Sequence, residues 1–191
     1  MISKVDDCPW STVAGRPAAG VFGGGRIGDR PLYTPEQRRR RDASHWTLVQ
    51  GVLAPVQFAV FLISVFLVVR YLDTGRGLTA ASASVLVKTA CLYAIMITGS
   101  LWERDVFGRY LFAPAFFWED VVSIVVLTLH TAYLACLFSD ALEPRDRMLL
   151  ALAAYAAYVV NAGQFLLKLR AARLEGEAAS ARTGAMAGQP T

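Results

Sequence analysis

Four long apolar runs dominate this sequence and limit the folds open to it. A helix needs about 20 predominantly apolar residues to cross the hydrocarbon core of a bilayer. Four runs meet that requirement: Trp46 to Val69, Thr79 to Trp102, Pro114 to Phe138 and Met148 to Leu167. The alternating apolar pattern of an outer-membrane barrel is absent from the sequence. We therefore predict an all-α, polytopic membrane protein with four transmembrane helices in an antiparallel bundle.

The two ends of the chain differ in composition from the apolar runs. Residues 1–32 are rich in glycine, proline and scattered charge and have no periodic apolar face. We expect a disordered tail there and a second one over residues 176–191, which leaves a membrane domain over residues 33–175. Gly23-Gly24-Gly25 lacks the preceding strand and the following Gly-Lys-Ser/Thr of a phosphate loop. The start of the sequence also lacks the pattern of a secretory signal.

Ordered structure is predicted to begin at a helix start. Thr34, Pro35 and Gln37 supply an N-cap hydroxyl, a proline at the first helical position and a capping-box partner. The basic run Arg38 to Arg41 follows, immediately before the first apolar run. Its position next to a membrane span favours a membrane-surface anchor over a nucleic-acid site.

The basic residues near the membrane ends predict the topology. With the amino terminus inside, nine basic residues face the cytoplasm and four face the opposite side. The cytoplasmic set is Arg38 to Arg41, Arg104, Arg109, Lys168, Arg170 and Arg173; the other is Arg70, Arg76, Arg145 and Arg147. We therefore expect both termini on the cytoplasmic side of a bacterial inner membrane.

The stretch Gly108 to Asp120, GRYLFAPAFFWED, lies between the second and third apolar runs. It combines aromatic residues with the adjacent carboxylates Glu119 and Asp120, whereas a plain connector is usually polar. This composition suits a surface that holds a large, flat, apolar ligand against an acid. The simpler interpretation of the carboxylates is that they favour the positive end of a helix dipole.

Polar residues within the predicted spans are costly unless they are paired or face a cavity. One stripe of the first span is expected to face the bundle interior; it consists of Gln50, Ala54, Gln57, Phe61 and Ser64. The second span carries Lys88, and the fourth carries a stripe formed by Tyr158, Asn161, Gln164 and Lys168. The amides are equally well explained by hydrogen bonds between helices.

His130 shares a face of the third predicted span with Glu119. The two residues are eleven positions apart, which is three helical turns or about 16 Å. His130 is either a hydrogen-bonded packing residue or an intramembrane nitrogen ligand. With only two histidines and three cysteines, and no Cys-x-x-Cys pair, we predict no protein metal site and no haem.

Four strings in the sequence resemble the 2-vinyl bacteriochlorophyllide hydratase family: LYTPEQRRRRDAS, WTLVQGVLAPVQF, GRYLFAPAFFWEDV and LALAAYAAYVVNAGQFLLKLRAARLE. The resemblance covers about Leu32 to Glu175. It implies a lyase of bacteriochlorophyll synthesis in the photosynthetic membrane, with chlorophyllide a or 3-vinyl bacteriochlorophyllide a as the substrate. Water would add across the 3-vinyl group (2-vinyl in the older numbering) to give a 1-hydroxyethyl group, with no cofactor. Association with other enzymes of the same synthesis is a further expectation.

The chemistry of hydration suggests roles for the candidate residues. The reaction needs a protonated acid, a positioned water and a dry aromatic pocket. A carboxyl group that is partly buried beside another carboxylate retains its proton more readily. We therefore assign Glu119 as the acid, Asp120 as the group that supports it or holds the water, and Glu103 as the reserve candidate.

The remaining candidates would bind the pigment. Arg104 or Arg109 could pair with its free propionate, and Tyr110 could hydrogen-bond a peripheral carbonyl. His130 is a possible ligand of the substrate's magnesium. The candidates for the ring faces and for further polar contacts are Phe112, Phe116, Phe117, Trp118, Asn161 and Gln164. The alternative function is a non-catalytic pigment-binding or assembly protein of the photosynthetic membrane; a quinone- or haem-binding subunit is a weaker one.

Overall fold

The computed structural model describes residues 32–187, and all of the regular structure in this part of the chain is helical. The predicted amino-terminal tail lies outside the described residues, apart from Leu32. The helices are α1 (Pro35–Ala43), α2 (His45–Thr74), α3 (Leu78–Phe107), α4 (Phe117–Ser139) and α5 (Pro144–Ala187). Helices α2, α3 and α4 and the Pro144–Leu174 part of α5 are long and apolar enough to cross a membrane. The predicted all-α class is confirmed, and the four candidate spans match the predicted number.

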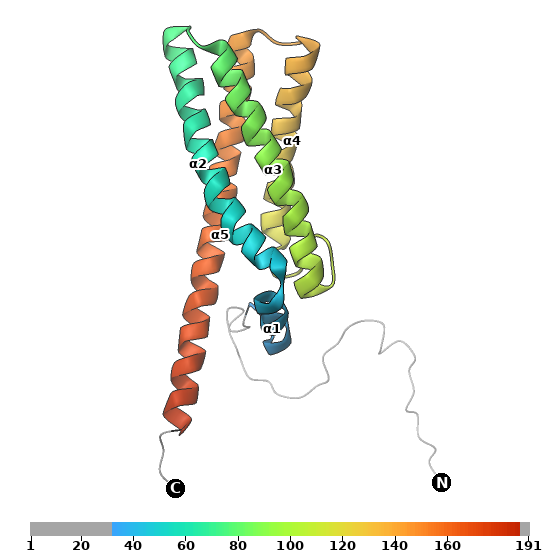
Figure 1. Cartoon of the computed structure of the whole chain (residues 1–191), viewed down its shortest axis with the longest axis vertical. Coiled ribbons are helices and arrows are strands. Elements are labelled where there is room, and N and C mark those ends of the chain that lie inside the picture. The colour runs from blue at the N-terminus through green and yellow to red at the C-terminus, as the bar shows by residue number, and fades with distance from the viewer. Residues whose placement is uncertain (1–31, 188–191) are drawn as a thin grey trace, which may run out of the picture. The chain divides into compact units, whose positions relative to one another are not determined.

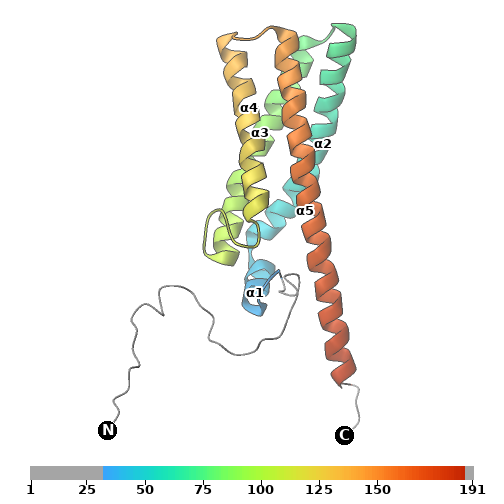
Figure 2. The same cartoon turned by 180° about the vertical axis from the view of Figure 1, so that it is seen from behind.

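The four long helices alternate in direction along the chain (Figure 1). The short α2–α3 and α4–α5 connections lie together at one end of the bundle, which we call the turn end. Helix α1 and the 108–116 connection lie at the other end, which we call the loop end (Figures 1 and 2). Helix α2 packs mainly on α3, and α4 packs mainly on α5. The bundle is therefore two antiparallel helix pairs, with looser packing between α3 and α4.

Local sequence signals account for several helix ends. The predicted capping box is confirmed: the Gln37 amide donates to Thr34 Oγ1 at 3.2 Å, and the Thr34 amide donates to Gln37 Oε1 at 2.9 Å. Helices α2 and α3 end at Gly75 and Gly108, which have φ values of 68° and 77°. Glycine is favoured there because the left-handed conformation is strained for residues with a Cβ.

Two helix ends differ from the predicted spans. Helix α4 begins at Phe117 rather than at Pro114, because a turn closed by the Phe116 amide and the Ala113 carbonyl (2.8 Å) precedes it. Helix α5 runs twenty residues beyond Leu167, to Ala187, and so enters the predicted carboxy-terminal tail. Alanine, leucine, arginine and glutamate, all good helix formers, dominate the residues just after Leu167.

Buried side chains form two clusters. The larger fills the bundle and includes Val68, Val85, Leu92, Val126, Tyr133, Met148 and Tyr155. The smaller lies at the loop end, where Tyr33, Val106 and Phe116 are surrounded by Trp102, Phe107 and Phe165. Within the stripe predicted to face the interior, Gln57, Phe61 and Ser64 are buried, whereas Ala54 is exposed. The small cluster fixes the end of α3 against the start of α4.

Candidate active site

Two carboxyl groups from different helices meet at the loop end of the bundle. Glu103 lies near the end of α3 and Asp120 lies in the first turn of α4, and both are buried. Their side chains lie within hydrogen-bonding reach of each other. An ionised carboxylate has no hydrogen to donate, so a hydrogen bond between two carboxyl groups forms only when one of them carries a proton. This arrangement suits a pair that shares one proton.

The 108–116 connection supplies further hydrogen bonds to this carboxyl pair. The Phe112 amide donates to Asp120 Oδ2 at 2.7 Å, and the Ala113 amide donates to Glu103 Oε2 at 3.2 Å. Phe112 adopts a φ of 59°, which for a residue other than glycine costs about 1–3 kcal/mol. The Asp120 hydrogen bond holds the backbone in this strained conformation. The loop and the acid pair thus depend on each other.

Glu119 forms an ion pair with Lys168 of α5. Lys168 Nζ lies 2.6 Å from Glu119 Oε2, donates to the Ala115 carbonyl and sits 4.8 Å from the centre of the Phe116 ring. Sequence reasoning placed Lys168 only in a polar stripe and in the basic count. A lysine at the end of a span needs a polar or charged partner, and this signal could have pointed to a carboxylate on another helix. The sequence separation of 49 residues concealed which carboxylate it was.

A shallow pocket opens beside this ion pair. It has a volume of ≈ 330 Å³ and is lined by Leu32, Glu119, Gln164, Leu167, Lys168 and Ala171. The volume is at the lower end of the range for small-molecule sites. The walls are mostly apolar, and Gln164 Oε1 is buried without a hydrogen-bond partner among the described residues. The pocket can therefore accept a polar group or a water molecule at Glu119 and Gln164.

The aromatic residues of the Gly108–Asp120 stretch separate into two groups. Phe116 is only 4% exposed and belongs to the loop-end core, 5.5 Å from Trp102 between ring centres. Trp118 is 69% exposed, and Phe112 and Phe117 are also exposed. The rings of these three residues follow one another at 5.6 Å and 5.5 Å, so they form a continuous outer aromatic row. This row and the exposed Tyr110 are therefore the aromatic surfaces of the stretch that a ligand can contact.

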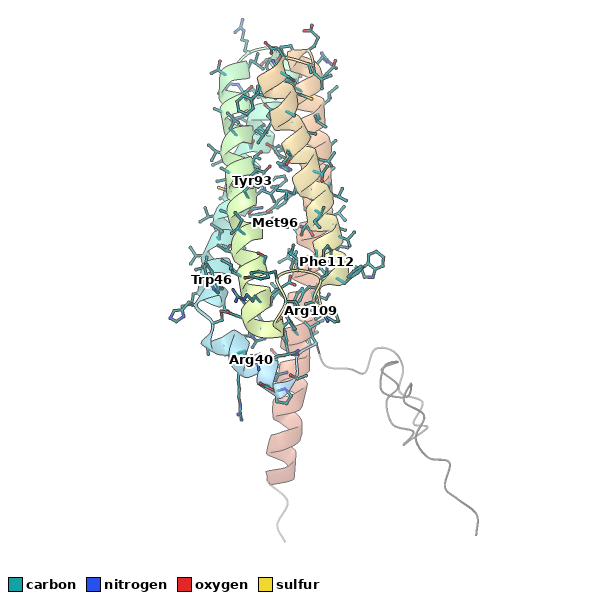
Figure 3. All side chains as sticks on the ribbon, turned by 90° about the vertical axis from the view of Figure 1, so that its right-hand side faces the viewer. Arg40, Trp46, Tyr93, Met96, Arg109 and Phe112 are labelled. Atoms are coloured by element: carbon teal, nitrogen blue, oxygen red, sulfur yellow. The ribbon has the colours of Figure 1, made fainter. Side chains whose placement is uncertain are left out.

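The predicted arginines lie at the same end of the bundle. Figure 3 shows Arg109 and Phe112 on the connection beside α3. The Arg104 guanidinium lies 4.9 Å from the centre of the Tyr110 ring, and Asp105 accepts a hydrogen bond from Ser44 Oγ at 2.8 Å. Asp105 therefore joins α3 to the start of α2.

The structure does not bring His130 to the carboxyl groups. His130 is fully buried in the middle of the bundle, and its Nδ1 donates to the Val126 carbonyl at 2.8 Å. That bond leaves Nε2 as an acceptor, which has no partner among the described residues. Asn161 lies between His130 and the carboxyl groups, and its side-chain amide donates to Ser123 Oγ at 2.8 Å. Within residues 32–187, no cluster of three or more His, Cys, Asp or Glu could hold a metal ion.

Comparison with known proteins identifies the family. The model of the 2-vinyl bacteriochlorophyllide hydratase family matches residues 33–171, which include α1 to α4 and α5 as far as residue 171. The chain belongs to this family. It is 65% identical to the 2-vinyl bacteriochlorophyllide hydratase of Cereibacter sphaeroides over 151 residues, which is 78% of this chain and 93% of the relative.

A second relative has the same name. The chain is 59% identical to the 2-vinyl bacteriochlorophyllide hydratase of Rhodobacter capsulatus over 155 residues, or 81% of this chain and 90% of the relative. No solved structure matches the chain. The matched region includes Glu103, Glu119, Asp120 and Lys168, so the whole candidate site lies within the family domain.

Proposed function

We propose that this protein hydrates the 3-vinyl group of a chlorophyllide or bacteriochlorophyllide, with the Glu103–Asp120 pair as the acid and Glu119 as the base. The observation that carries this proposal is the arrangement of three carboxyl groups in two environments. Glu103 and Asp120 are buried within hydrogen-bonding reach of each other, and Glu119 is ion-paired with Lys168. An acid and a base for adding water are thus available side by side.

The proposed reaction moves one proton in a cycle. The Glu103–Asp120 pair gives its proton to the terminal vinyl carbon, and positive charge develops on the carbon next to the ring, where the macrocycle delocalises it. Water adds there, and the Glu119 carboxylate takes the proton that this water loses. Solvent returns that proton to the pair. Addition of water leaves the pigment's overall oxidation state unchanged, so no redox cofactor takes part.

This assignment differs from the roles that we inferred from the sequence. There, Glu119 was the acid and Glu103 the reserve candidate. The contact with Lys168 stabilises Glu119 as a carboxylate, which suits a base and water-holding group better than a proton donor. Glu103 and Asp120 take the acid role because two buried carboxyl groups within hydrogen-bonding reach favour sharing one proton.

The outer aromatic row is the proposed binding surface for the macrocycle. Phe112, Phe117 and Trp118 present exposed ring faces next to the start of α4, where the carboxyl groups lie. Aromatic rings stack favourably on a flat conjugated ligand. Gln164, with a buried acceptor that lacks a partner, is the proposed second contact for the attacking water. Substrate must displace the Phe112–Ala113 backbone to reach the acid pair, and the strain at Phe112 favours such movement.

The loop end of the bundle is proposed to face the cytoplasm. Helix α1, with Arg38 to Arg41, and the lower part of α5 carry most of the basic residues that flank the spans, and both lie at that end (Figure 1). A water-soluble thiol reagent applied to intact spheroplasts tests this orientation, in a chain whose native cysteines have been replaced. It should label a cysteine placed at Arg76 and not one placed at Arg39. The reverse labelling would invert the topology.

Turnover in labelled water tests the proposed reaction. Purified protein in detergent is incubated with 3-vinyl chlorophyllide a in oxygen-18 water, and the pigment is analysed by absorption spectroscopy and mass spectrometry. A blue-shifted red band and a labelled hydroxyethyl product are expected. Pigment that binds and co-purifies unchanged would instead support the non-catalytic alternative, which uses the same aromatic row.

A further inference from the structure

A second pocket at the loop end is lined by three arginines. It lies between α1 and α5, has a volume of ≈ 290 Å³, and its lining residues are Arg38, Arg41, Ala172, Arg173 and Gly176. Arg38 and Arg41 come from the basic run before the first span, and Arg173 comes from α5, more than 130 positions later. The fold therefore gathers positive charge from two separate segments around one hollow.

Two of the three guanidinium groups have no carboxylate partner in the described part of the chain. Arg41 pairs with Asp42 at 2.7 Å and lies 5.0 Å from the centre of the Tyr33 ring. No ion pair or hydrogen bond of Arg38 or Arg173 occurs among the described side chains. Burial raises the pKa of the Tyr33 phenol, so it stays neutral and does not offset this charge. The pocket therefore has a net positive charge.

This pocket adjoins the pocket of the candidate active site. Ala171 lines the active-site pocket and Ala172 lines the arginine pocket, so the two open on different sides of the same part of α5. Leu32 lines the first pocket, while Tyr33 lies under Arg41 of the second. The pockets thus flank the Leu32–Tyr33 segment. From Lys168 to Arg173 is five residues, about 7.5 Å along the helix axis, and a tetrapyrrole macrocycle is itself on the order of 10 Å across.

We infer that the Arg38–Arg41–Arg173 pocket binds the free carboxylate of the pigment and thereby holds the vinyl group at the carboxyl site. The inference rests on the proposed function, because it takes a pigment with a free carboxylate as the substrate. A guanidinium offers a planar fork of donors that matches a carboxylate, which makes arginine the preferred residue for such a site. Arg104, one of the two arginines suggested by the sequence, instead lies over the Tyr110 ring.

The same chemistry would also recognise the phosphate of an anionic lipid headgroup, and the experiment separates the two sources. Full-length protein is assayed in neutral detergent with 3-vinyl chlorophyllide a and with its methyl ester, which lacks the negative charge. Arg38→Gln, Arg173→Gln and the double variant are compared with Arg39→Gln. Arg39 belongs to the same basic run but is exposed and does not line the pocket, so it is a matched control for the change in charge.

The expected result is a change in KM that depends on the carboxylate. Loss of a charge-assisted hydrogen bond should raise KM for the free acid about 10- to 100-fold in the double variant, with kcat at saturation nearly retained. The double variant should no longer distinguish acid from ester, whereas wild type and Arg39→Gln should prefer the acid. Arg173→Lys should retain more of the preference for the free acid than Arg173→Gln does. Lysine keeps the positive charge but lacks the planar pair of donors of a guanidinium.

Several outcomes would overturn the inference. If the double variant kept the wild-type preference for the acid over the ester, the pocket would not bind the carboxylate. A loss of activity that is equal for both pigments, and that appears only when anionic lipid is added, would assign the pocket to a lipid headgroup. Wild-type protein that hydrates neither pigment would sink the proposed function instead. Absorption titrations of the two pigments would still test the pocket in that case.

Discussion

The protein buries polar groups in two regions, and they differ in what they are equipped to do. The carboxyl site at the loop end, formed by Glu103, Glu119, Asp120 and Lys168, contains both signs of charge and adjoins an open pocket. The mid-bundle cluster, formed by Gln57, Lys88, His130, Tyr155 and Tyr158, has a buried cation with no carboxylate partner in the described chain. Neither of the two loop-end pockets reaches this cluster.

The Lys88 ammonium is stabilised by other residues of the mid-bundle cluster. Lys88 Nζ lies 3.6 Å from the centre of the Tyr158 ring. With the Gln57 amide turned so that both of its atoms are satisfied, its oxygen accepts from Lys88 at 2.9 Å and its nitrogen donates to the Cys91 carbonyl at 3.2 Å. The difference between the regions teaches that a buried charge alone does not mark a site. The carboxyl site is distinguished by an adjoining pocket and by three carboxyl groups in two different environments.

The largest effect is expected from removing the shared proton. Glu103→Gln or Asp120→Asn should each lower kcat about 10²- to 10⁴-fold, because each amide replaces a carboxyl group of the pair while keeping its shape. The double variant should lose little more than either single variant, since the two groups act as one unit. The measurement is kcat for pigment hydration, with Asp105→Asn as the control on the same helix.

Full turnover by Glu103→Gln and Asp120→Asn, with a properly folded protein, would remove the acid assignment. If Glu119→Gln alone abolished turnover while these two variants stayed active, the acid role would return to Glu119. That result would leave the family membership intact and would redraw the carboxyl site around the Lys168 ion pair.

A smaller effect, on both stability and rate, is expected from Lys168→Met. It leaves the Glu119 carboxylate buried without its partner, which should lower the free energy of unfolding by about 2 kcal/mol. It should also lower kcat about tenfold, because Glu119 loses the partner that positions its carboxylate for the attacking water. Thermal unfolding in detergent and pigment turnover measure the two effects.

The companion variants test the cause of the Lys168→Met effect. Lys168→Arg should keep the ion pair and most of the activity. The double variant Glu119→Gln/Lys168→Met should recover stability but not turnover, because it removes the unpaired charge together with the base. If the double variant were fully active, Glu119 would be only a structural partner of Lys168.

Much of the fold could be predicted because it follows from local and one-dimensional signals. Runs of apolar residues predict the spans, and Thr34 with Gln37 predicts the start of α1. The sequence composition predicts a disordered tail over residues 176–191, whereas α5 extends to Ala187 because helix-forming residues continue past the last apolar run. Helix propensity and hydropathy are separate properties of a sequence.

The carboxyl site could be predicted only in part. The sequence indicates the position of the site, since the adjacent acids Glu119 and Asp120 follow an aromatic stretch. The partners of these acids could not be predicted, because Glu103 and Lys168 reach them only through the packing of three helices. Adjacent residues on a helix point in different directions, so Glu119 and Asp120 find partners on different helices rather than each other.

A weak effect is expected from His130→Gln, which probes the boundary between the two regions. His130 is about 16 Å along α4 from Glu119 and is enclosed by the bundle. KM for the pigment should therefore change less than about threefold. A magnesium ligand would behave differently: its loss should raise KM more than tenfold for the magnesium pigment and leave KM for the magnesium-free pigment unchanged. That pattern would extend the substrate site into the mid-bundle cluster.

The smallest effect is expected from Lys88→Met, which tests the comparison most directly. Methionine has a similar length and shape, and it removes a desolvated ammonium that no carboxylate offsets. The thermal midpoint should stay the same or rise, and kcat should change less than about twofold. Lys88→Ala is the control for volume, because truncating a fully buried side chain should cost about 2–5 kcal/mol. If Lys88→Met lowered kcat as much as Glu103→Gln, the mid-bundle cluster would belong to the proton path, and the distinction between the two buried regions would fail.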